Sequence, residues 1–426
     1  MKNEQRAWVI TVDMGYGHQR AAYPFKKIAE ERIITANSDK IITPQEKKLW
    51  KRSRWIYEAI SRITSVPLVG PKIFEMYDRL QKILPMHPYR DLSFATPQVK
   101  YMQRLINKGL GRSISEYTKK KKIPLLTTFF TTAIAADQAD ISPVYCVVCD
   151  VDINRIWVAE NPKKSRIVYL VPTKRAARRL TEYGVPKKNI ILTGFPLPKE
   201  NIGGRSMKTL KKDLGSRLIN LDPQKRFIHH HDQLTGLRRK GKKNHPLTLT
   251  FVVGGAGAQV DIGVKMLHSL REFILQKVIR VNLVAGTRLE VAQKFHEAAL
   301  KLGLTGQIGK GINIDVYLSK PEYFAGFSQT LRTTDILWTK TSEMSFYTAL
   351  GIPIICAPPI GAHEYFNLNW LLQMGSGIVQ EDPQYTHEWL FDWLDRGILA
   401  KAAFDGYALA PKLGTYNIEK VIFGKG

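Results

Sequence analysis

The sequence predicts an α/β protein of two doubly wound domains, each with a parallel sheet between layers of helices. Strand-like and helical patterns alternate along most of the chain, which is typical of parallel sheets. Two apolar strands run directly into glycines and then into a helix, at Gly15 and at Gly254. The chain of 426 residues is also longer than a domain with a single hydrophobic core usually is. These observations favour two Rossmann-like domains that face each other across a cleft.

The first domain is expected over residues 1–198. Its strands are predicted at 7–13, 124–130, 143–149, 166–171 and 189–193. Its helices are predicted at 19–31, 133–138 and 174–183, with two amphipathic helices at 45–65 and 71–85. These two helices carry isoleucine and leucine on one face, and basic residues crowd the start of the first.

The second domain is expected over residues 199–390, followed by a helical tail at 391–426 that packs back on the first domain. Residues 199–247 look irregular and very basic, with one helix. The second alternation is predicted to have strands at 247–253, 281–285, 312–317, 336–339 and 352–357, and a helix at 344–350.

The charge of the chain is large and uneven. The net charge is +27. Residues 1–250 hold 48 Lys and Arg against 21 Asp and Glu, while residues 251–426 hold 16 of each sign. A basic first part attracts an anionic partner, which can be an anionic membrane surface, a nucleic acid or a phosphorylated substrate. Composition alone does not choose among these three.

Several other classes of protein are disfavoured. Hydrophobic residues at 44% and charged residues at 24% are typical of a soluble globular protein. No apolar run approaches the length of a membrane span, and the N-terminus leads into a strand rather than a signal-peptide core. Three cysteines are too few for a disulfide framework. We therefore expect a reducing, cytoplasmic location.

The first glycine turn holds the main candidate for chemistry. Gly15, Tyr16 and Gly17 form a tight turn after the first strand, and His18 opens the helix that follows. This order places His18 at the carboxyl end of a sheet, where open α/β folds bind ligands. The alternative is an ordinary βα turn with a surface histidine.

The second glycine turn is suited to a diphosphate, because the amides of a helix N-terminus favour negative charge. The alternatives are a dinucleotide site and a turn without a ligand. A dinucleotide is disfavoured, because the glycine spacing is out of register and no acidic residue ends a second strand about 20 residues on. The residues of this turn are Gly254, Gly255, Gly257 and Gln259.

Polar residues follow the later strands of the second domain. Gly286 makes a glycine turn, and the hydroxyls of Thr341 and Ser342 are placed to cap a helix. Glu343 is either a partner of the helix dipole or an acceptor for sugar hydroxyls. Glu364 and Asn367, three residues apart at a helix start, suit the hydroxyls of a hexose.

Two further features allow a functional and a structural interpretation. Basic and aromatic residues at the start of helix 45–65 suit an anionic membrane leaflet, but also a hairpin with a solvated charged face. The proposed membrane contacts are Lys51, Arg52, Arg54 and Trp55, with Trp50 and Tyr57 nearby. The triplet His229–His231 beside Asp232 is interpreted as a loop or strand and not as a metal site, because adjacent histidines on a strand point to opposite faces.

Five segments occur in the order found in one enzyme group. They are 15–18, 147–150, 171–196, 254–259 and 351–367. On these segments the chain resembles the GT-B glycosyltransferases that build membrane glycolipids. These include monogalactosyldiacylglycerol synthases, processive diacylglycerol glucosyltransferases and the lipid II-forming N-acetylglucosaminyltransferase. The resemblance covers most of residues 7–385.

The resemblance implies an inverting, metal-independent transferase. The first domain would take a lipid acceptor, and the second a nucleotide-sugar, expected to be a uridine-diphosphate sugar. His18 would be the general base, with Asp150 as its helper or alternative. The nucleotide-sugar would be a co-substrate, so no cofactor or metal is expected. The enzyme would be peripheral on the inner face of the cell membrane and would not bind nucleic acid.

The chain departs from the family's pattern at three places. Phe346 stands where the family has a glutamate that grips the ribose, and Glu343 lies one turn earlier on the same helix face. Tyr16 replaces a glycine, and Pro358–Pro359 is unusual in the sugar segment. The nucleotide and the sugar therefore stay open.

Two other functions compete with this interpretation. A nucleotide-sugar 2-epimerase has the same architecture but acts on a soluble substrate. A non-catalytic nucleic-acid-binding protein would use the charge of +27 and would bind in a salt-sensitive manner.

Overall fold

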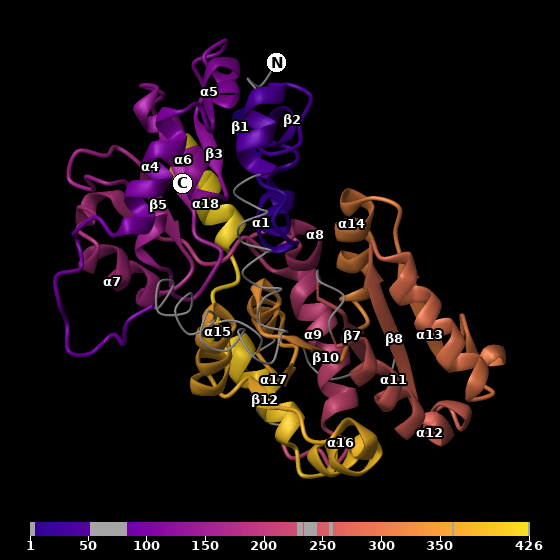
Figure 1. Ribbon diagram of the computed structural model, residues 1–426. Coiled ribbons are helices and arrows are strands. Elements are labelled where there is room, and N and C mark those ends of the chain that lie inside the picture. The colour runs from indigo at the N-terminus through magenta and orange to yellow at the C-terminus, as the bar shows by residue number, and fades with distance from the viewer. Residues whose placement is uncertain are drawn as a thin grey trace, which may run out of the picture. The chain divides into compact units, whose positions relative to one another are not determined.

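The computed structural model describes residues 5–51, 83–227, 233, 245–254, 259–359 and 362–424 (Figure 1). The chain divides into two compact units. The first comprises Met1–Pro196, Gly361–Phe366 and Leu413–Gly426, and the second comprises Leu197–Ile360 and Asn367–Lys412. Each unit is a parallel sheet with flanking helices.

The first unit has six parallel strands in the order β2-β1-β3-β4-β5-β6. They are β1 (Ala7–Thr11), β2 (Ala29–Thr35), β3 (Leu125–Thr127), β4 (Val144–Val147), β5 (Val168–Val171) and β6 (Ile190–Leu192). The helices are α1 (Gly17–Ala22), α4 (Pro97–Asn107), α5 (Arg112–Thr118), α6 (Phe130–Gln138), α7 (Lys174–Glu182) and α18 (Gly414–Phe423), with the short 3₁₀ turns η1 (Tyr23–Phe25), η2 (Arg155–Trp157) and η3 (Lys187–Asn189). The chain leaves β1 toward β2 on one side and later fills the other side with β3. The carboxyl edge between β1 and β3 is therefore the reversal point at which open α/β sheets bind ligands.

Both faces of this sheet are buried, which explains the continuous apolar runs of its strands. Trp8 and Ile10 of β1 enter one core cluster, while Ala7 and Val9 enter another. Ile418 of α18 belongs to the second cluster, so the C-terminal helix closes that face.

The second unit also has six parallel strands, in the order β12-β11-β10-β7-β8-β9. They are β7 (Leu247–Val252), β8 (Ile279–Gly286), β9 (Ile312–Val316), β10 (Ile336–Lys340), β11 (Ile354–Ala357) and β12 (Gly377–Val379). The helices are α8 (Lys199–Ile202), α9 (Lys208–Leu221), α11 (Val260–Ser269), α12 (Arg271–Leu275), α13 (Leu289–Lys301), α14 (Lys320–Thr330), α15 (Ala362–Gln373), α16 (Thr386–Asp395) and α17 (Ile398–Leu409), with 3₁₀ turns η4 (Thr305–Gln307), η5 (Glu343–Leu350) and η6 (Pro383–Tyr385). Here the order reverses between β7 and β10.

Two predicted elements differ from the structure. The helix predicted at 19–31 is wrong in its second half, because α1 ends at Ala22 and β2 begins at Ala29. Strand β2 lies at the sheet edge and carries Glu30, Glu31 and Arg32, whose charges suit an edge strand but resemble a helix in the sequence. The helix predicted at 344–350 is the 3₁₀ segment η5.

The predicted tail is shared between the units. Helix α17 clusters with the second unit, and α18 with the first. A Cβ at Gly414 would lie 2.0 Å from the Phe195 carbonyl oxygen, so only glycine allows this approach. Asn417 donates a hydrogen bond of 2.9 Å to the Thr193 carbonyl. Within the described residues, no helix is both long and apolar enough to cross a membrane.

A half-buried histidine is expected to make the second unit sensitive to acid. Burial, aided by the charges of Arg217 and Arg280, lowers the pKa of His245. An unfolded histidine titrates near about 6.5. Because the folded pKa lies below the unfolded one, the unfolded state binds more protons at acidic pH, and stability falls as the pH drops below about 6.5. We expect His245→Asn to flatten this fall between about pH 7 and 5 in urea-unfolding curves. An equally steep fall in the variant would assign the acid sensitivity to other groups.

Candidate active site

The turn after β1 is fixed by a glycine and by a side chain that lies beyond β2. Gly15 has a φ of +89°, which favours glycine. Asn37, just beyond β2, accepts from the Asp13 amide at 2.8 Å and donates to the Asp13 carbonyl at 2.9 Å. Tyr16 is buried at the N-cap of α1, and Gly17 is the first residue of that helix. The turn therefore delivers His18 to the carboxyl edge at the β1–β3 reversal.

The protonation pattern of His18 follows from its partner. Its Nδ1 lies 2.8 Å from the backbone oxygen of Thr128, just beyond β3. A carbonyl oxygen only accepts, so Nδ1 carries the hydrogen in this contact. In the neutral ring, Nε2 is then the nitrogen with the lone pair. Thr128 also donates from its hydroxyl to the His18 carbonyl at 2.9 Å, which fixes the start of α1 against β3.

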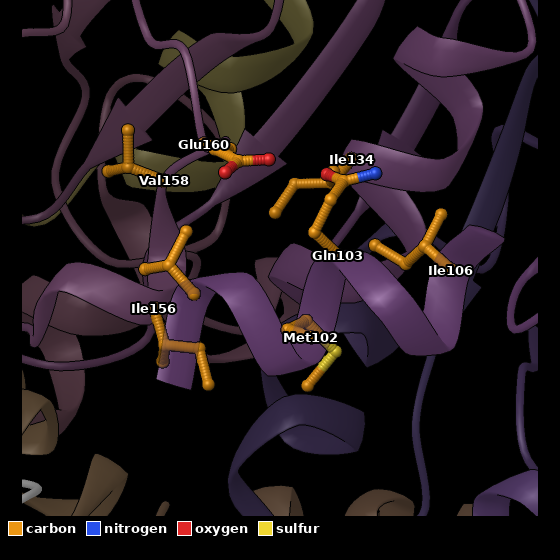
Figure 2. A pocket seen from close by; sticks show the side chains of 8 residues that line it. Met102, Gln103, Ile106, Ile134, Ile156, Val158 and Glu160 are labelled. Atoms are coloured by element: carbon orange, nitrogen blue, oxygen red, sulfur yellow. The ribbon is translucent and has the colours of Figure 1, made fainter. Parts of the chain in front are cut away.

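Aromatic side chains surround the imidazole. Phe129 meets it edge-on at 5.0 Å between ring centroids, and Trp157 lies at 6.0 Å. Ile156 and Val158, which flank Trp157, line a small hollow beside α4 and α6 (Figure 2). Its volume of about 10 Å³ holds roughly one water molecule and is far below the roughly 300–1,000 Å³ of typical ligand pockets, so we assign it no ligand.

Asp150 lies three residues beyond the end of β4 and is half-buried. The preceding residue, Cys149, directs its thiol to the same Thr128 oxygen that His18 contacts, at 3.7 Å. The segments that carry His18 and Asp150 therefore meet at one carbonyl group. Burial raises the pKa of a second thiol, that of Cys146 in β4, and so keeps it unreactive.

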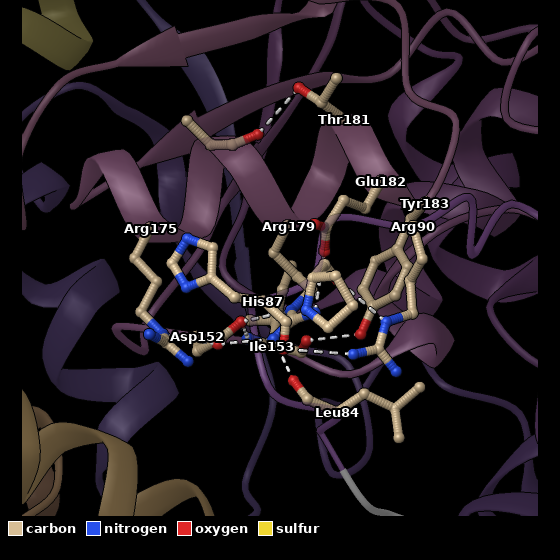
Figure 3. A network of polar contacts seen from close by, with 12 residues as sticks. Leu84, His87, Arg90, Asp152, Ile153, Arg175, Arg179, Thr181, Glu182 and Tyr183 are labelled. Carbon is tan, nitrogen blue, oxygen red and sulfur yellow. Dashed lines mark hydrogen bonds and ion pairs between the residues drawn. The ribbon is translucent and has the colours of Figure 1, made fainter.

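A buried ionic cluster supports the segment after Asp150 (Figure 3). Arg179 of α7 donates from Nε to Asp152 at 2.9 Å and from Nη1 to Glu182 at 2.9 Å. Arg175 donates to the same Asp152 carboxylate at 2.7 Å. Burial alone would lower the pKa of the Arg179 guanidinium, but the hydrogen bond and charge of Asp152 outweigh it, and the pKa is raised.

The predicted diphosphate turn is described in part. Gly254 follows β7, and Gly286 ends the neighbouring strand β8 with a φ of +68°. Gln259 opens α11, and its side-chain amide donates to the Pro358 carbonyl at 3.0 Å. These three positions gather at the carboxyl edge of the second sheet. The predicted residues Gly255 and Gly257 lie outside the described residues.

The segment after β10 lacks the side-chain cap that was predicted for Ser342. Thr341 is fully buried, and Ser342 occupies the N-cap of η5 but makes no capping hydrogen bond with its side chain. Glu343 is the first residue of η5 and is half-buried. Phe346 is buried against Trp370 at 5.2 Å between ring centroids. In a 3₁₀ helix residues three apart align, so Glu343 stands directly one turn before Phe346.

The two predicted sugar-binding residues lie on one face of α15. Glu364 is in its first turn with 2% exposure, and Asn367 is fully buried. Their spacing of three residues places both side chains on the same helix face.

The predicted membrane contacts are mostly outside the described residues. Lys51 is exposed on a helical segment, while Arg52, Arg54 and Trp55 lie outside, as does the triplet at 229–231. The prediction that Trp50 belongs to a membrane-facing surface is wrong. Trp50 is 3% exposed in the core and donates to Glu46 at 3.3 Å. In the described part of the chain, no three His, Cys, Asp or Glu residues are grouped as metal ligands would be.

The sequence does not reveal two residues that lie at the carboxyl edges of the two sheets, Thr128 and Lys340. Thr128 contributes its backbone oxygen, which no side-chain pattern reveals. Lys340 ends β10 beside Gly254, and its position depends on the pairing of β10 with β7.

Comparison with known proteins gives distant relatives over most of the chain. No family model matches. A processive diacylglycerol beta-glucosyltransferase from Bacillus subtilis (strain 168) is 21% identical over 89% of this chain and 84% of its own length. One from Bacillus cereus (strain AH187) is 27% identical over 58% of this chain and 52% of its own.

Solved structures align at low similarity. MurG from Acinetobacter baumannii aligns with 98% of this chain and 99% of its own, at 13% identity and a TM-score of 0.49. A putative UDP-N-acetylglucosamine 2-epimerase from Listeria monocytogenes aligns with 83% of this chain and 84% of its own, at 16% identity and a TM-score of 0.46. The two parallel sheets and the curated relatives confirm the predicted GT-B fold class and the predicted glycosyltransferase class. The chain thus resembles, over most of its length, the processive diacylglycerol beta-glucosyltransferases.

Proposed function

We propose that this chain transfers a sugar from a nucleoside-diphosphate donor to the hydroxyl group of a lipid acceptor. The proposed nucleoside of the donor is uridine. The observation that carries the proposal is the 2.8 Å contact of His18 Nδ1 with the Thr128 carbonyl. It leaves the lone pair of a neutral imidazole on Nε2, which is the arrangement that a general base needs. The acceptor oxygen attacks the anomeric carbon as its proton passes to Nε2, and the diphosphate leaves with inversion.

Asp150 is proposed as the helper of His18. When Nε2 takes the acceptor proton, the ring becomes an imidazolium. The Thr128 oxygen holds this cation through Nδ1, and the half-buried Asp150 supplies a compensating negative charge from the adjoining segment.

The donor is proposed to bind at the carboxyl edge of the second sheet. Gly254 and Gly286 allow its diphosphate to approach the backbone. Phe346 is buried against Trp370, so we propose Glu343 as the residue that contacts the ribose. Thr341 and Gln259 are proposed to lie beside the diphosphate. Neither a metal nor a cofactor takes part in the proposed reaction, so a chelator leaves the rate unchanged.

The acceptor is proposed to reside in a membrane, because the relatives are named for diacylglycerol. The described surface of the first unit carries exposed aromatic rings at Tyr89, Phe94 and Tyr101, and exposed cations at Lys51 and Lys100. Such rings settle at the interface, and each nearby cation adds about 1 kcal/mol on an anionic leaflet. We place the enzyme peripherally on the inner face of the cell membrane.

A transfer assay tests this function directly. The purified chain is mixed with UDP-glucose, UDP-galactose or UDP-N-acetylglucosamine and with vesicles that contain diacylglycerol and an anionic phospholipid. We expect a glycolipid product and free UDP. A soluble epimer formed without vesicles would support the epimerase instead. Salt-sensitive RNA or DNA binding without any nucleotide-sugar binding would support the nucleic-acid binder.

The sugar-binding residues give a narrower prediction. We expect Glu364→Gln or Asn367→Ala to weaken binding of the donor about tenfold or more while binding of UDP alone changes little, because these side chains would hold the sugar hydroxyls. Isothermal titration with both ligands measures this difference. Gln373→Ala, at the exposed end of the same helix, is the control. Equal affinities in both variants and wild type would remove the two residues from the donor site.

A further inference from the structure

The side chain of Lys340 lies directly over Gly254. A Cβ built on Gly254 would meet Lys340 Cε at 2.6 Å, Cδ at 2.9 Å and Cγ at 3.6 Å. The aliphatic stem therefore crosses the Cα of Gly254 at close range. Any other residue at position 254 would push the lysine out of this place.

The pairing of two strands sets this arrangement. Strand β10 pairs with β7 in parallel, with Thr339 opposite Val252, so Lys340 ends its strand beside the point where the chain leaves β7. This is the reversal point of the second sheet, between β7 and β10. Thr339 donates from its hydroxyl to the Val252 carbonyl, which fixes the strand end.

We propose that the Lys340 ammonium binds the donor's diphosphate and neutralises the negative charge that develops on it as it leaves. This inference rests on the proposed function and adds a cation that can neutralise the diphosphate without a metal. The stem is half-buried, which costs the side chain little further ordering when the ligand binds. A fixed ammonium at a departing diphosphate stabilises the transition state more than the ground state.

The test compares ligands that differ by one phosphate. Titration calorimetry measures UDP and UMP binding to wild type, Lys340→Met and Lys340→Arg. We expect Lys340→Met to lose about tenfold or more in UDP affinity and to keep its UMP affinity within about threefold. Lys340→Arg retains the charge and should keep most of the preference for UDP. Lys310→Met, an exposed lysine just before β9 at the amino edge of the sheet, is the matched control.

A second variant displaces Lys340 by changing Gly254, the residue on which its stem packs. Gly254→Ala would displace the stem, so we expect a loss of UDP affinity that does not add to that of Lys340→Met in the double variant. Thermal unfolding of each variant identifies any loss of fold. Wild-type UDP affinity in Lys340→Met would overturn the assignment and leave the proposed function standing. If the wild type binds no nucleoside diphosphate or nucleotide-sugar, both the function and this assignment fall.

Discussion

Replacing His18 by alanine is expected to lower the transfer rate by about 10²–10⁴-fold, because it removes the group that takes the acceptor proton. Binding of UDP should stay within about twofold of wild type, because no donor contact is proposed for His18. Steady-state rates on vesicles, together with calorimetry for UDP, separate the two effects. The acidic limb of the pH–rate profile should also disappear, since protonation of this imidazole stops the wild-type reaction.

The His18 experiment needs two controls. His18→Asn can still donate to the Thr128 carbonyl but offers no basic nitrogen, so it should be as slow as His18→Ala while its thermal unfolding matches wild type. His296→Ala removes an exposed histidine of α13 and should have no effect. A fast His18→Asn enzyme would assign the proton to another group, with Asp150 next to be tested.

Most of the sheet strands and the first glycine turn could be predicted from the sequence. A strand buried on both faces is a continuous apolar run, and a positive φ such as that of Gly15 favours glycine. Strands β2 and β12 lie at the sheet edges. Charges fill β2, and β12 is only Gly377–Val379, so neither gave an apolar run to recognise.

The environment of single side chains was harder to predict. Trp50 stands beside Lys51 and Arg52 in the sequence, which suggests an interface. In the fold its ring is in the core, and its partner Glu46 accepts hydrogen bonds from the amides of Gly111 and Ser113. Only contacts about 65 residues away distinguish these two environments, and a local pattern does not contain them.

The candidate site shows the same division. Motif order identified His18 and the resemblance to a glycosyltransferase. Thr128 and Lys340 could not be predicted from the sequence. Thr128 contributes a backbone oxygen, and the position of Lys340 depends on the pairing of β10 with β7. The sequence did not identify the nucleotide, because Phe346 departs from the family's pattern. The burial of Phe346 against Trp370 leaves Glu343 as the proposed contact for the ribose.

Asp152→Asn is expected to destabilise the first unit by about 3–5 kcal/mol. Asp152 and Arg179 are completely buried, and Arg175 also donates to this carboxylate. The substitution leaves two guanidinium groups with Glu182 as the remaining carboxylate of the cluster (Figure 3). Urea unfolding measures the loss. Asp392→Asn breaks an exposed pair with Arg396 and should cost less than about 1 kcal/mol.

The same cluster holds the segment that precedes α4. Arg179 donates from Nη2 to the Leu84 carbonyl at 2.5 Å, and the Leu92 amide donates to the Glu182 carbonyl at 2.8 Å. We therefore expect Asp152→Asn to speed amide hydrogen exchange in residues 83–96 before it affects the β-sheet. Combining Asp152→Asn with Arg179→Met removes charges of both signs, so the double variant should lose less than the two single losses combined. Unchanged exchange at 83–96, with a loss below about 1 kcal/mol, would show that apolar packing alone holds this segment.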